Sequence, residues 1–205
     1  MLDFILSTCS YGRVTVETIQ CVEKLHKTAY EFEWWFQNGD ALIARSRCIA
    51  VTKFLKEGET PYMIFVDDDM GFEPEDIDKI LIAMDEGREI ICGLCVTQGD
   101  NRLAQWGWNG GKVNITGKPE EVEYASTGFL GISRKALEKI TQNMQLVNKG
   151  DWSECYPAFE CKAHNGLLVS EDYDFCNKAR DAGLNVYAHT GVKVTHQKNC
   201  ILTLK

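Results

Sequence analysis

The sequence is short of positive charge and contains no long apolar run. Lys and Arg total 22 against 30 Asp and Glu, and the formal net charge is -8. Nucleic-acid binding and binding to an anionic membrane both need a basic surface, so we expect neither partner. Because no apolar stretch approaches the roughly 20 residues that cross a bilayer, we also expect no membrane span. Acidity does not exclude a phosphate ligand, since a bound metal ion would reverse the local field.

A secretory leader and a cysteine framework are also missing. Residues 1–8 enter an apolar strand pattern without a basic lead, so we expect no signal peptide. The nine cysteines follow no repeating spacing, and Cys92-Gly-Leu-Cys95 lacks the second pair or the histidines of a zinc site. Zinc or redox chemistry at this pair is the alternative. Reduced thiols favour a cytoplasmic protein. We expect buried cysteines at Cys9, Cys48, Cys92, Cys95 and Cys176.

The first half of the chain alternates short apolar strands with amphipathic helices. The pattern predicts strands over 2–8, 31–36, 62–66 and 89–96, and helices over 14–27, 41–56 and 74–86. Such alternation implies a mostly parallel sheet with helices on both faces. The length of 205 residues suits one domain. We therefore predict a single-domain, three-layer α/β/α sandwich.

The pattern changes in the second half, and we divide the domain there into parts of about 1–97 and 98–205. We predict a hairpin of 103–108 with 112–116 across Asn109-Gly110-Gly111. Strands over 122–125 and 127–132 precede a helix over 134–142, which Ser133 caps. Residues 144–166 have weak periodicity, and we interpret them as a long mobile loop. A helix from Ser170 to Gly183 and strands over 185–188 and 192–195 follow.

Three consecutive acids follow the apolar strand over 62–66. Asp67, Asp68 and Asp69 therefore stand at the carboxyl end of a strand, where open α/β sheets bind their ligands. Adjacent carboxylates repel one another, and a hard cation such as Mg²⁺ or Mn²⁺ would remove that repulsion. The alternative is an acidic start to the helix at Pro74, because Asp is favourable near the positive end of a helix dipole.

Four local patterns stand in order along the chain. Ser7-Thr8-Cys9-Ser10-Tyr11 ends the first strand, Ala44-Arg45-Ser46-Arg47 begins the second helix, and the three acids follow. Ser170-Glu171-Asp172 opens a late helix, with His196 beyond it. This order resembles the nucleotide-sugar-dependent glycosyltransferases of the GT-A fold, which carry a DXD motif. Residues 127–132 are similar to their acceptor-side strand. The narrower resemblance is to compact glycosyltransferase domains encoded by large DNA viruses, which would act in the cytoplasm of a host cell.

This resemblance covers nearly the whole chain and implies a Rossmann-like GT-A fold with a small acceptor-side hairpin. It implies transfer of a sugar from a nucleotide-diphosphate donor, most simply a UDP-sugar, to a hydroxyl of a glycan or other acceptor. Asp67 and Asp69 would bind Mn²⁺ or Mg²⁺, and Asp67 and Asp68 would also face the donor. His196 would be a further metal ligand, and a structural histidine is the alternative.

Asp172, with Glu171 beside it, is implied to be the catalytic carboxylate on the acceptor side. In inverting members of the family the matching Asp takes the proton from the acceptor hydroxyl, whereas in retaining members a carboxylate there positions substrate. The alternative is a helix cap, since Ser170-Glu171-Asp172 also suits a helix N-terminus. The resemblance leaves the stereochemical outcome open.

The resemblance places further residues around the donor. Arg45 would reach the pyrophosphate or the acids, and is otherwise an exposed helix arginine. The residues implied to line the base and ribose pocket are Thr8, Ser10, Tyr11, Arg13, Asn38 and Asp40. Trp106 and Trp108 could stack on a sugar or belong to the core. The residues that could form a lid over the donor are Tyr156, Phe159 and His164.

The chain also departs from the family. The usual Arg-Asn pair of the second helix reads Arg45-Ser46, and the chain is short, so the acceptor part is minimal and the chain could be one domain of a longer protein. A sugar nucleotidyltransferase is an alternative enzyme, but Ser10-Tyr11-Gly12-Arg13 is not its Gly-rich phosphate loop with lysine. A non-catalytic nucleotide- or carbohydrate-binding domain is the other alternative.

Overall fold

A central eight-stranded sheet organises the chain. The computed structural model describes residues 2–96, 103–108, 111–112, 114–148, 154–164 and 166–197, with Trp106 and His164 described by their backbone only. The strand order is β2-β1-β3-β8-β5-β13-β7-β6. These strands are β1 (Phe4–Ser10), β2 (Phe32–Asn38), β3 (Tyr62–Val66), β5 (Ile90–Leu94), β6 (Trp106–Trp108), β7 (Pro119–Tyr124), β8 (Phe129–Ser133) and β13 (Val186–Lys193). Within this sheet β7 and β8 run against the other strands, so the direction is mostly parallel.

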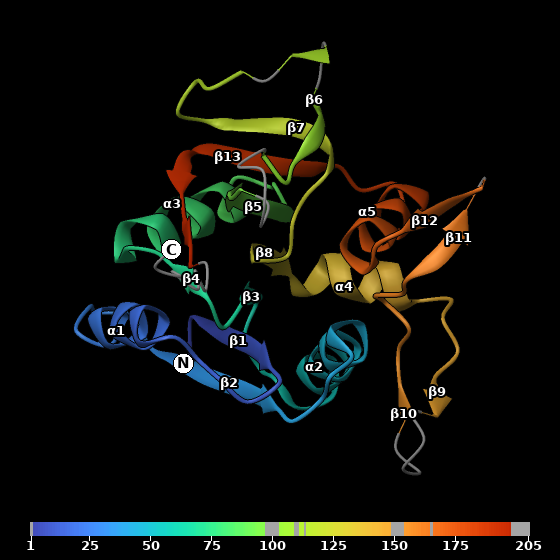
Figure 1. Ribbon diagram of the computed structural model, residues 1–205, viewed down its shortest axis with the longest axis horizontal. Coiled ribbons are helices and arrows are strands. Elements are labelled where there is room, and N and C mark those ends of the chain that lie inside the picture. Colours follow the sequence, from blue (N-terminus) through green and yellow to red (C-terminus); the bar gives the residue numbers. More distant parts are fainter. Residues whose placement is uncertain are drawn as a thin grey trace, which may run out of the picture.

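Helices cover both faces of the sheet (Figure 1). The helices of the described chain are α1 (Val16–Leu25), α2 (Ile43–Glu57), α3 (Pro74–Asp85), α4 (Arg134–Thr141) and α5 (Glu171–Asp181). One apolar core lies between the sheet and α1 with α3, and a second lies between the sheet and α2, α4 and α5. This is the predicted α/β/α sandwich.

Strand alternation divides the central strands between the two cores. Leu6 and Ile64 belong to the core under α1 and α3, whereas Ile5 and Met63 belong to the other core, as successive strand side chains point to opposite faces. The parallel register pairs Ser10 at the end of β1 with the last residue of β2, and β3 ends beside them. The carboxyl ends of β1, β2 and β3 therefore meet at one edge.

Shorter strands complete the structure. β4 (Met70–Gly71) follows the acid run directly and pairs with β14 (Thr195–His196), which brings a late segment of the chain to the same edge. The other short pairs are β9 (Val147–Asn148) with β10 (Glu154–Cys155) and β11 (Lys162–His164) with β12 (Leu167–Val169). No helix among the described residues combines the length and the hydropathy needed to cross a membrane.

The predicted hairpin of 103–108 with 112–116 is wrong in its second strand. β6 pairs with β7 instead, and residues 114–118 form a turn. The reason is the buried hydroxyl of Thr190, which accepts from the backbone N–H groups of Gly117 and Lys118 at 2.9 and 3.1 Å and donates to the Lys118 carbonyl at 2.8 Å. The proposed turn residues Asn109 and Gly110 lie outside the described residues.

The prediction of one long loop over 144–166 is also wrong. Besides the three short strands β9, β10 and β11, this stretch supplies Cys155 and Phe159 to the core. The backbone N–H of Tyr156 donates to the Thr52 hydroxyl of α2 at 2.8 Å, and the Phe159 ring stacks on Phe175 of α5 with centroids 4.5 Å apart. Long-range contacts that leave no local periodicity therefore order the described part of this segment.

Most of the last two predicted strands, 185–188 and 192–195, lies in one strand, β13, and Thr195 begins β14. Gly191 allows the register of β13 to shift, because a Cβ at Gly191 would come within 2.7 Å of the Gly117 carbonyl oxygen. The cysteines predicted to be buried are buried, and the eight described cysteines form no disulfide with one another.

Candidate functional site

The acid run forms a turn between β3 and β4. The Asp67 N–H donates to the Gly128 carbonyl at 3.0 Å, and the Thr15 N–H donates to the Asp68 carbonyl at 2.8 Å. Helix α3 begins only at Pro74, and its N-terminus is closed by a capping box between Glu73 and Asp76. The alternative interpretation of the acid run as the start of this helix is therefore wrong.

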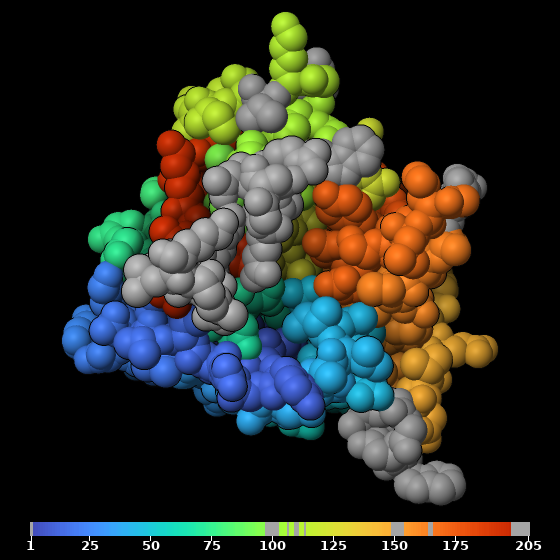
Figure 2. Space-filling view, viewed as in Figure 1, coloured from blue at the N-terminus to red at the C-terminus, as the bar shows by residue number. Residues whose placement is uncertain are grey.

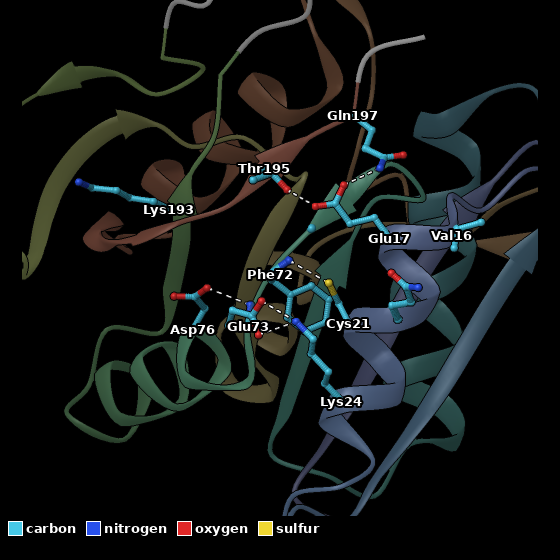
Figure 3. A pocket seen from close by; sticks show the side chains of 12 residues that line it. Val16, Glu17, Cys21, Lys24, Phe72, Glu73, Asp76, Lys193, Thr195 and Gln197 are labelled. Atoms are coloured by element: carbon cyan, nitrogen blue, oxygen red, sulfur yellow. Dashed lines mark hydrogen bonds and ion pairs between the residues drawn. The ribbon is translucent and has the colours of Figure 1, made fainter.

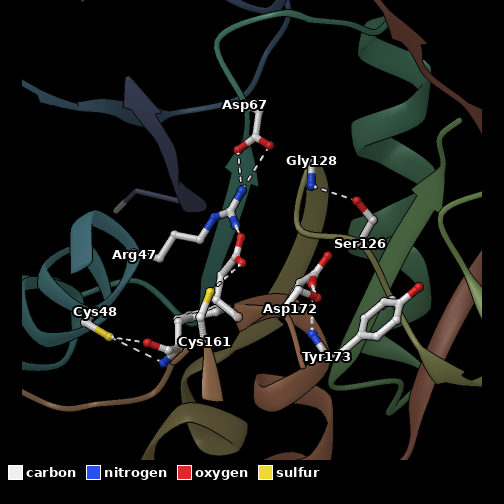
Figure 4. A network of polar contacts seen from close by, with 12 residues as sticks. Arg47, Cys48, Asp67, Ser126, Gly128, Cys161, Asp172 and Tyr173 are labelled. Carbon is white, nitrogen blue, oxygen red and sulfur yellow. Dashed lines mark hydrogen bonds and ion pairs between the residues drawn. The ribbon is translucent and has the colours of Figure 1, made fainter. Parts of the chain in front are cut away.

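A buried arginine joins the acid run to helix α5. The Nη2 atom of Arg47 lies 2.8 and 3.0 Å from the two carboxylate oxygens of Asp67, and its Nη1 atom lies 2.6 Å from Glu171 Oε1 (Figure 4). Arg47 is only 3% exposed. The two acids come from opposite halves of the chain, so this one side chain fixes the distance between them.

The carboxylates of Asp67 and Glu171 stabilise the positive charge of Arg47. Burial alone would lower the pKa of the Arg47 guanidinium, but the adjacent Asp67 and Glu171 carboxylates raise it above its ordinary value. Arg47 is therefore cationic at any pH at which the protein is folded. Without Arg47, each of the two carboxylates would be a partly buried charge that lacks its cationic partner.

Sequence reasoning missed Arg47 and pointed to Arg45. Arg45 lies at the surface, where its guanidinium pairs with Asp40 at 2.6 and 2.8 Å. The signal for Arg47 was its spacing from Val51 and Phe54, four and seven residues later, which are fully buried on the same helix. A charged residue within the buried stripe of a helix calls for a buried partner.

Asp172 lies at the first turn of α5, beside the Arg47 junction (Figure 4). Its Oδ1 accepts the hydroxyl of Ser170 and the N–H of Tyr173, the latter at 2.9 Å. Burial raises the pKa of the Asp172 carboxyl, and the charge of Glu171 adds to this rise, against the opposing effects of the Ser170 hydrogen bond and Arg47. A carboxylate with a raised pKa is a better proton acceptor than an ordinary one.

The helix N-terminus expected by the capping alternative is present, since Glu171 and Asp172 lie in the first turn of α5 and Asp172 accepts from the Tyr173 N–H. Ser170 does occupy the N-cap position of α5, as predicted, but its side chain makes no capping hydrogen bond to the helix backbone. Its hydroxyl turns to Asp172 instead. Ser170 therefore orients Asp172, and a place at the helix N-terminus is compatible with a catalytic role for Asp172.

His196 meets Asp69 across the β4–β14 pair. Its Nε2 lies 3.1 Å from Asp69 Oδ2, and its Nδ1 lies 2.9 Å from the Val96 carbonyl oxygen. A carbonyl only accepts, so Nδ1 carries the proton, and a neutral ring then directs the Nε2 lone pair at the carboxylate. A cation placed between the two groups would be attracted by both of them.

Asp69 and His196 could supply two of the ligands of a divalent metal ion. Within the described ranges, no group of three or more His, Cys, Asp or Glu side chains is arranged to hold a metal. Imidazole nitrogen and carboxylate oxygen are both ligands of Mn²⁺, and a metal of this kind commonly takes one or two protein ligands with the rest from phosphate and water. The pair Asp69–His196 fits that mode, with Asp67 nearby but engaged by Arg47.

Asp68 stands between these two acids and differs from them. Burial raises the pKa of its carboxyl, and the charges of Asp69 and Asp67 raise it further, whereas a hydrogen bond from Ser10 lowers it. Ser10 also closes the turn after β1, because its hydroxyl oxygen accepts from the N–H groups of Gly12 and Arg13 at 3.0 and 3.1 Å. The ends of β1 and β3 are thereby linked.

Some of the side chains predicted to surround the nucleotide are buried and others are exposed. Thr8 is fully buried, and its hydroxyl accepts from the Trp34 indole at 3.0 Å, so it supports the edge from beneath. Tyr11, Arg13 and Asn38 are exposed above it at the neighbouring ends of β1 and β2. Asp40 accepts from the Leu42 N–H at 2.9 Å, which fixes the turn into α2.

The predicted lid and stacking residues are not all at this edge. Phe159 is 2% exposed in the core between Phe65 and Phe175, so its assignment to a lid is wrong. Trp108 is buried, in agreement with the core alternative. Tyr156 is half-buried, and the side chains of Trp106 and His164 lie outside the described residues. In a space-filling view, the segments that carry the site border one face of the molecule, with α1, α2 and α5 in blue, cyan and orange (Figure 2).

Comparison with solved structures confirms the fold. The chain is similar to the crystal structure of A197 from STIV, with a TM-score of 0.67 and 21% identity over 97% of this chain and 87% of that one. It is also similar to GalNAc-T7 crystallised with UDP, GalNAc and Mn²⁺, with a TM-score of 0.55 and 10% identity over 95% of this chain. The chain spans only 44% of the GalNAc-T7 chain. The architecture is the expected GT-A, Rossmann-like one.

The sequence comparisons add no relative. No protein-family model matches the chain, and no curated protein matches it.

Proposed function

We propose that this protein is a metal-dependent glycosyltransferase that moves a sugar from a nucleotide-diphosphate donor, most simply a UDP-sugar, to a hydroxyl of a glycan or other acceptor. The observation that carries the proposal is that the acid run on a GT-A-like sheet contacts His196 through Asp69 and the start of α5 through Arg47, which lies between Asp67 and Glu171. The structural similarity to GalNAc-T7, which was crystallised with UDP, GalNAc and Mn²⁺, supports the choice of donor and metal.

Asp69 and His196 are the residues that would hold Mn²⁺ or Mg²⁺. Bound there, the metal would stabilise the negative charge that develops on the leaving diphosphate. The protein contributes a fixed imidazole, because the Val96 carbonyl holds the opposite ring nitrogen. This orientation exists before any ligand enters.

Asp172 is the proton acceptor if the reaction inverts the anomeric centre. The acceptor oxygen forms a bond to the anomeric carbon, the bond from that carbon to the diphosphate breaks, and the hydroxyl proton passes to the Asp172 carboxylate. The raised pKa of Asp172 makes this transfer more favourable than it would be for an exposed aspartate.

Arg47 and the acids that it binds set the distance between the two halves of the site. Because Arg47 pairs with Asp67 on one side and Glu171 on the other, it holds the metal-binding turn and the start of α5 together. Asp67, oriented by this contact, is suited to accept hydrogen bonds from hydroxyls of the donor ribose or sugar. Glu171 then acts as a positioning residue for the neighbouring Asp172.

The direct test is release of UDP from a panel of UDP-sugars, with Mn²⁺ or with EDTA, with and without candidate acceptors. Slow hydrolysis of one UDP-sugar that requires Mn²⁺ and is lost in Asp69→Asn would support the proposal. The matched control is Asp78→Asn, an acid of α3 that bonds Tyr30 away from this edge. Mn²⁺-independent turnover, or binding of UDP without turnover of any sugar donor, would contradict it.

A further inference from the structure

The side chains of β14 and of Gln197, which follows it, contact two different partners. The hydroxyl of Thr195 donates to Glu17 Oε1 at 2.8 Å, and the Gln197 amide donates to Glu17 Oε2 at 2.5 Å (Figure 3). His196, between them, faces Asp69 instead. This is the alternation of an extended strand, in which successive side chains point in opposite directions. One carboxylate of α1 therefore fastens both neighbours of His196.

The same helix also holds the acid run. The buried hydroxyl of Thr18, one residue beyond Glu17, contacts the carbonyl oxygens of Asp68 and Met70 at 3.2 and 2.8 Å. The first turn of α1 thus contacts the strand that carries His196 and the residues on either side of Asp69. A shift of β14 relative to β4 would have to break contacts to this one turn.

The junction leaves little room for adjustment. A Cβ atom at Gly71 of β4 would overlap both Glu17 Oε1 and Thr195 Oγ1. The glycine therefore lets the carboxylate and the threonine approach each other directly above the strand. Close approach of this kind is a recognised use of glycine.

Polar contacts join α1 to β14, while Val194 before β14 and Met70 opposite His196 are buried in the apolar core. A cavity of about 500 Å³ opens between α1, β4 and the segment around β14, lined largely by polar and charged side chains (Figure 3). β14 itself is only two residues long. Glu17 and Thr195 lie 178 positions apart, so no local structure brings them together.

We infer that Glu17 is a positioning residue for His196: through Thr195 and Gln197 it holds the imidazole beside Asp69 before a metal ion binds. This inference rests on the proposed metal site, and it adds to that site a residue that touches neither metal nor substrate. Because the two ligands are already in place, metal binding does not have to supply the free energy needed to order a short strand.

Substitutions of Glu17 should lower the affinity for the metal ion, and the loss should be larger when more acceptor atoms are removed. Residues that orient a metal ligand typically change metal affinity by about 10- to 100-fold when they are replaced. Glu17→Ala removes both acceptors and should weaken Mn²⁺ binding in that range. Glu17→Gln keeps one acceptor oxygen and should lie between Glu17→Ala and the wild type.

The test is the dissociation constant of Mn²⁺, measured on the purified chain by the electron paramagnetic resonance of free Mn²⁺ in the presence of UDP. Measurements stay well below the unfolding temperature of each variant, because a purely structural role would lower that temperature without weakening Mn²⁺ binding to the folded protein. The matched control is Glu23→Ala, an exposed acid of the same helix that pairs with Lys27 at 3.0 Å. It should bind Mn²⁺ like the wild type.

A second readout needs no metal. The imidazole nitrogen resonances of His196, identified by their absence in His196→Gln, should be narrow in the metal-free wild type and exchange-broadened in Glu17→Ala. Equal Mn²⁺ affinity in Glu17→Ala and the wild type would overturn the inference and leave the proposed function intact. A wild type that binds no Mn²⁺ would overturn the metal site, and unchanged His196 resonances in Glu17→Ala would then overturn the positioning role separately.

Discussion

Arg47 Nη1 lies 2.6 Å from Glu171 Oε1, although the two residues are 124 positions apart in the sequence. The other guanidinium nitrogen holds Asp67, so the first residue of the acid run and the first residue of α5 share one buried cation. The two halves of the chain meet at this contact, and the proposed donor and acceptor sides of the site meet with them.

The first prediction concerns this contact. Arg47→Met should destabilise the fold by about 3–5 kcal/mol, because it leaves two acids without their partner. For a domain of this size that is a fall in Tm on the order of 10 °C, measured by thermal unfolding. Adding Asp67→Asn and Glu171→Gln to Arg47→Met should restore much of the loss, since the stranded charges are then gone.

Arg45→Met is the control for that experiment. Arg45 is exposed on the same helix and pairs with Asp40, so its loss should cost less than that of Arg47, which is buried against two acids. A fall in Tm for Arg47→Met no larger than that for Arg45→Met would contradict the assignment of Arg47 as the joint between the two halves.

The second prediction concerns catalysis by Asp172. Asp172→Asn should lower sugar transfer by about 10²- to 10⁴-fold, the usual contribution of a general base. Binding of UDP with Mn²⁺, measured by calorimetry, should stay close to that of the wild type. Transfer at the wild-type rate in Asp172→Asn would reduce this residue to a structural one.

The third prediction concerns the stability of the same variant as a function of pH. Burial raises the pKa of Asp172, so its contribution to stability is full below the pKa of an unfolded aspartate and is lost as the pH rises through the folded value. Asp172→Asn should therefore have a higher Tm than the wild type at pH 7. The difference should shrink as the pH falls through the folded value toward about 4, the ordinary pKa of aspartate, and should be largely gone below it. A lower Tm for the variant at pH 7 would show that the ionised carboxylate is stabilising instead.

The fourth prediction separates a core residue from a lid. Phe159 packs between Phe65 and Phe175, so Phe159→Ala should cost about 3–5 kcal/mol of stability, measured by urea unfolding. Leu168→Ala is the comparison, because Leu168 is 84% exposed nearby in the chain and should change stability by about 0.5 kcal/mol or less. A stable Phe159→Ala variant that hydrolyses a UDP-sugar faster would instead favour a lid.

The elements of the first half were predictable because their apolar periodicity is local. β3 has the predicted bounds, and α3 begins at the predicted Pro74. The errors lie where tertiary contacts decide: the Thr190 hydroxyl makes a turn of 114–118, and contacts with α2 and α5 order the stretch that contains Phe159. Neither kind of contact leaves a pattern in neighbouring residues.

The site shows the same division. The acid run and Asp172 stood out because carboxylates at a strand end and at a helix start are visible in the sequence alone. Arg47 was missed because an arginine on an amphipathic helix is usually solvated. Its role depends on Glu171, which a sequence of this kind does not place beside it.

The measurement that tests the account most directly is thermal unfolding of the wild type and His196→Gln with UDP, each with Mn²⁺ and with EDTA. A ligand at a hundred times its dissociation constant adds about 2.7 kcal/mol, or roughly 5–10 °C for a domain of this size. The account predicts a rise of that order in the wild type only when UDP and Mn²⁺ are both present, and a much smaller rise in His196→Gln. No rise with UDP under any condition, or an equal rise in EDTA, would contradict a metal-bound nucleotide site at Asp69 and His196.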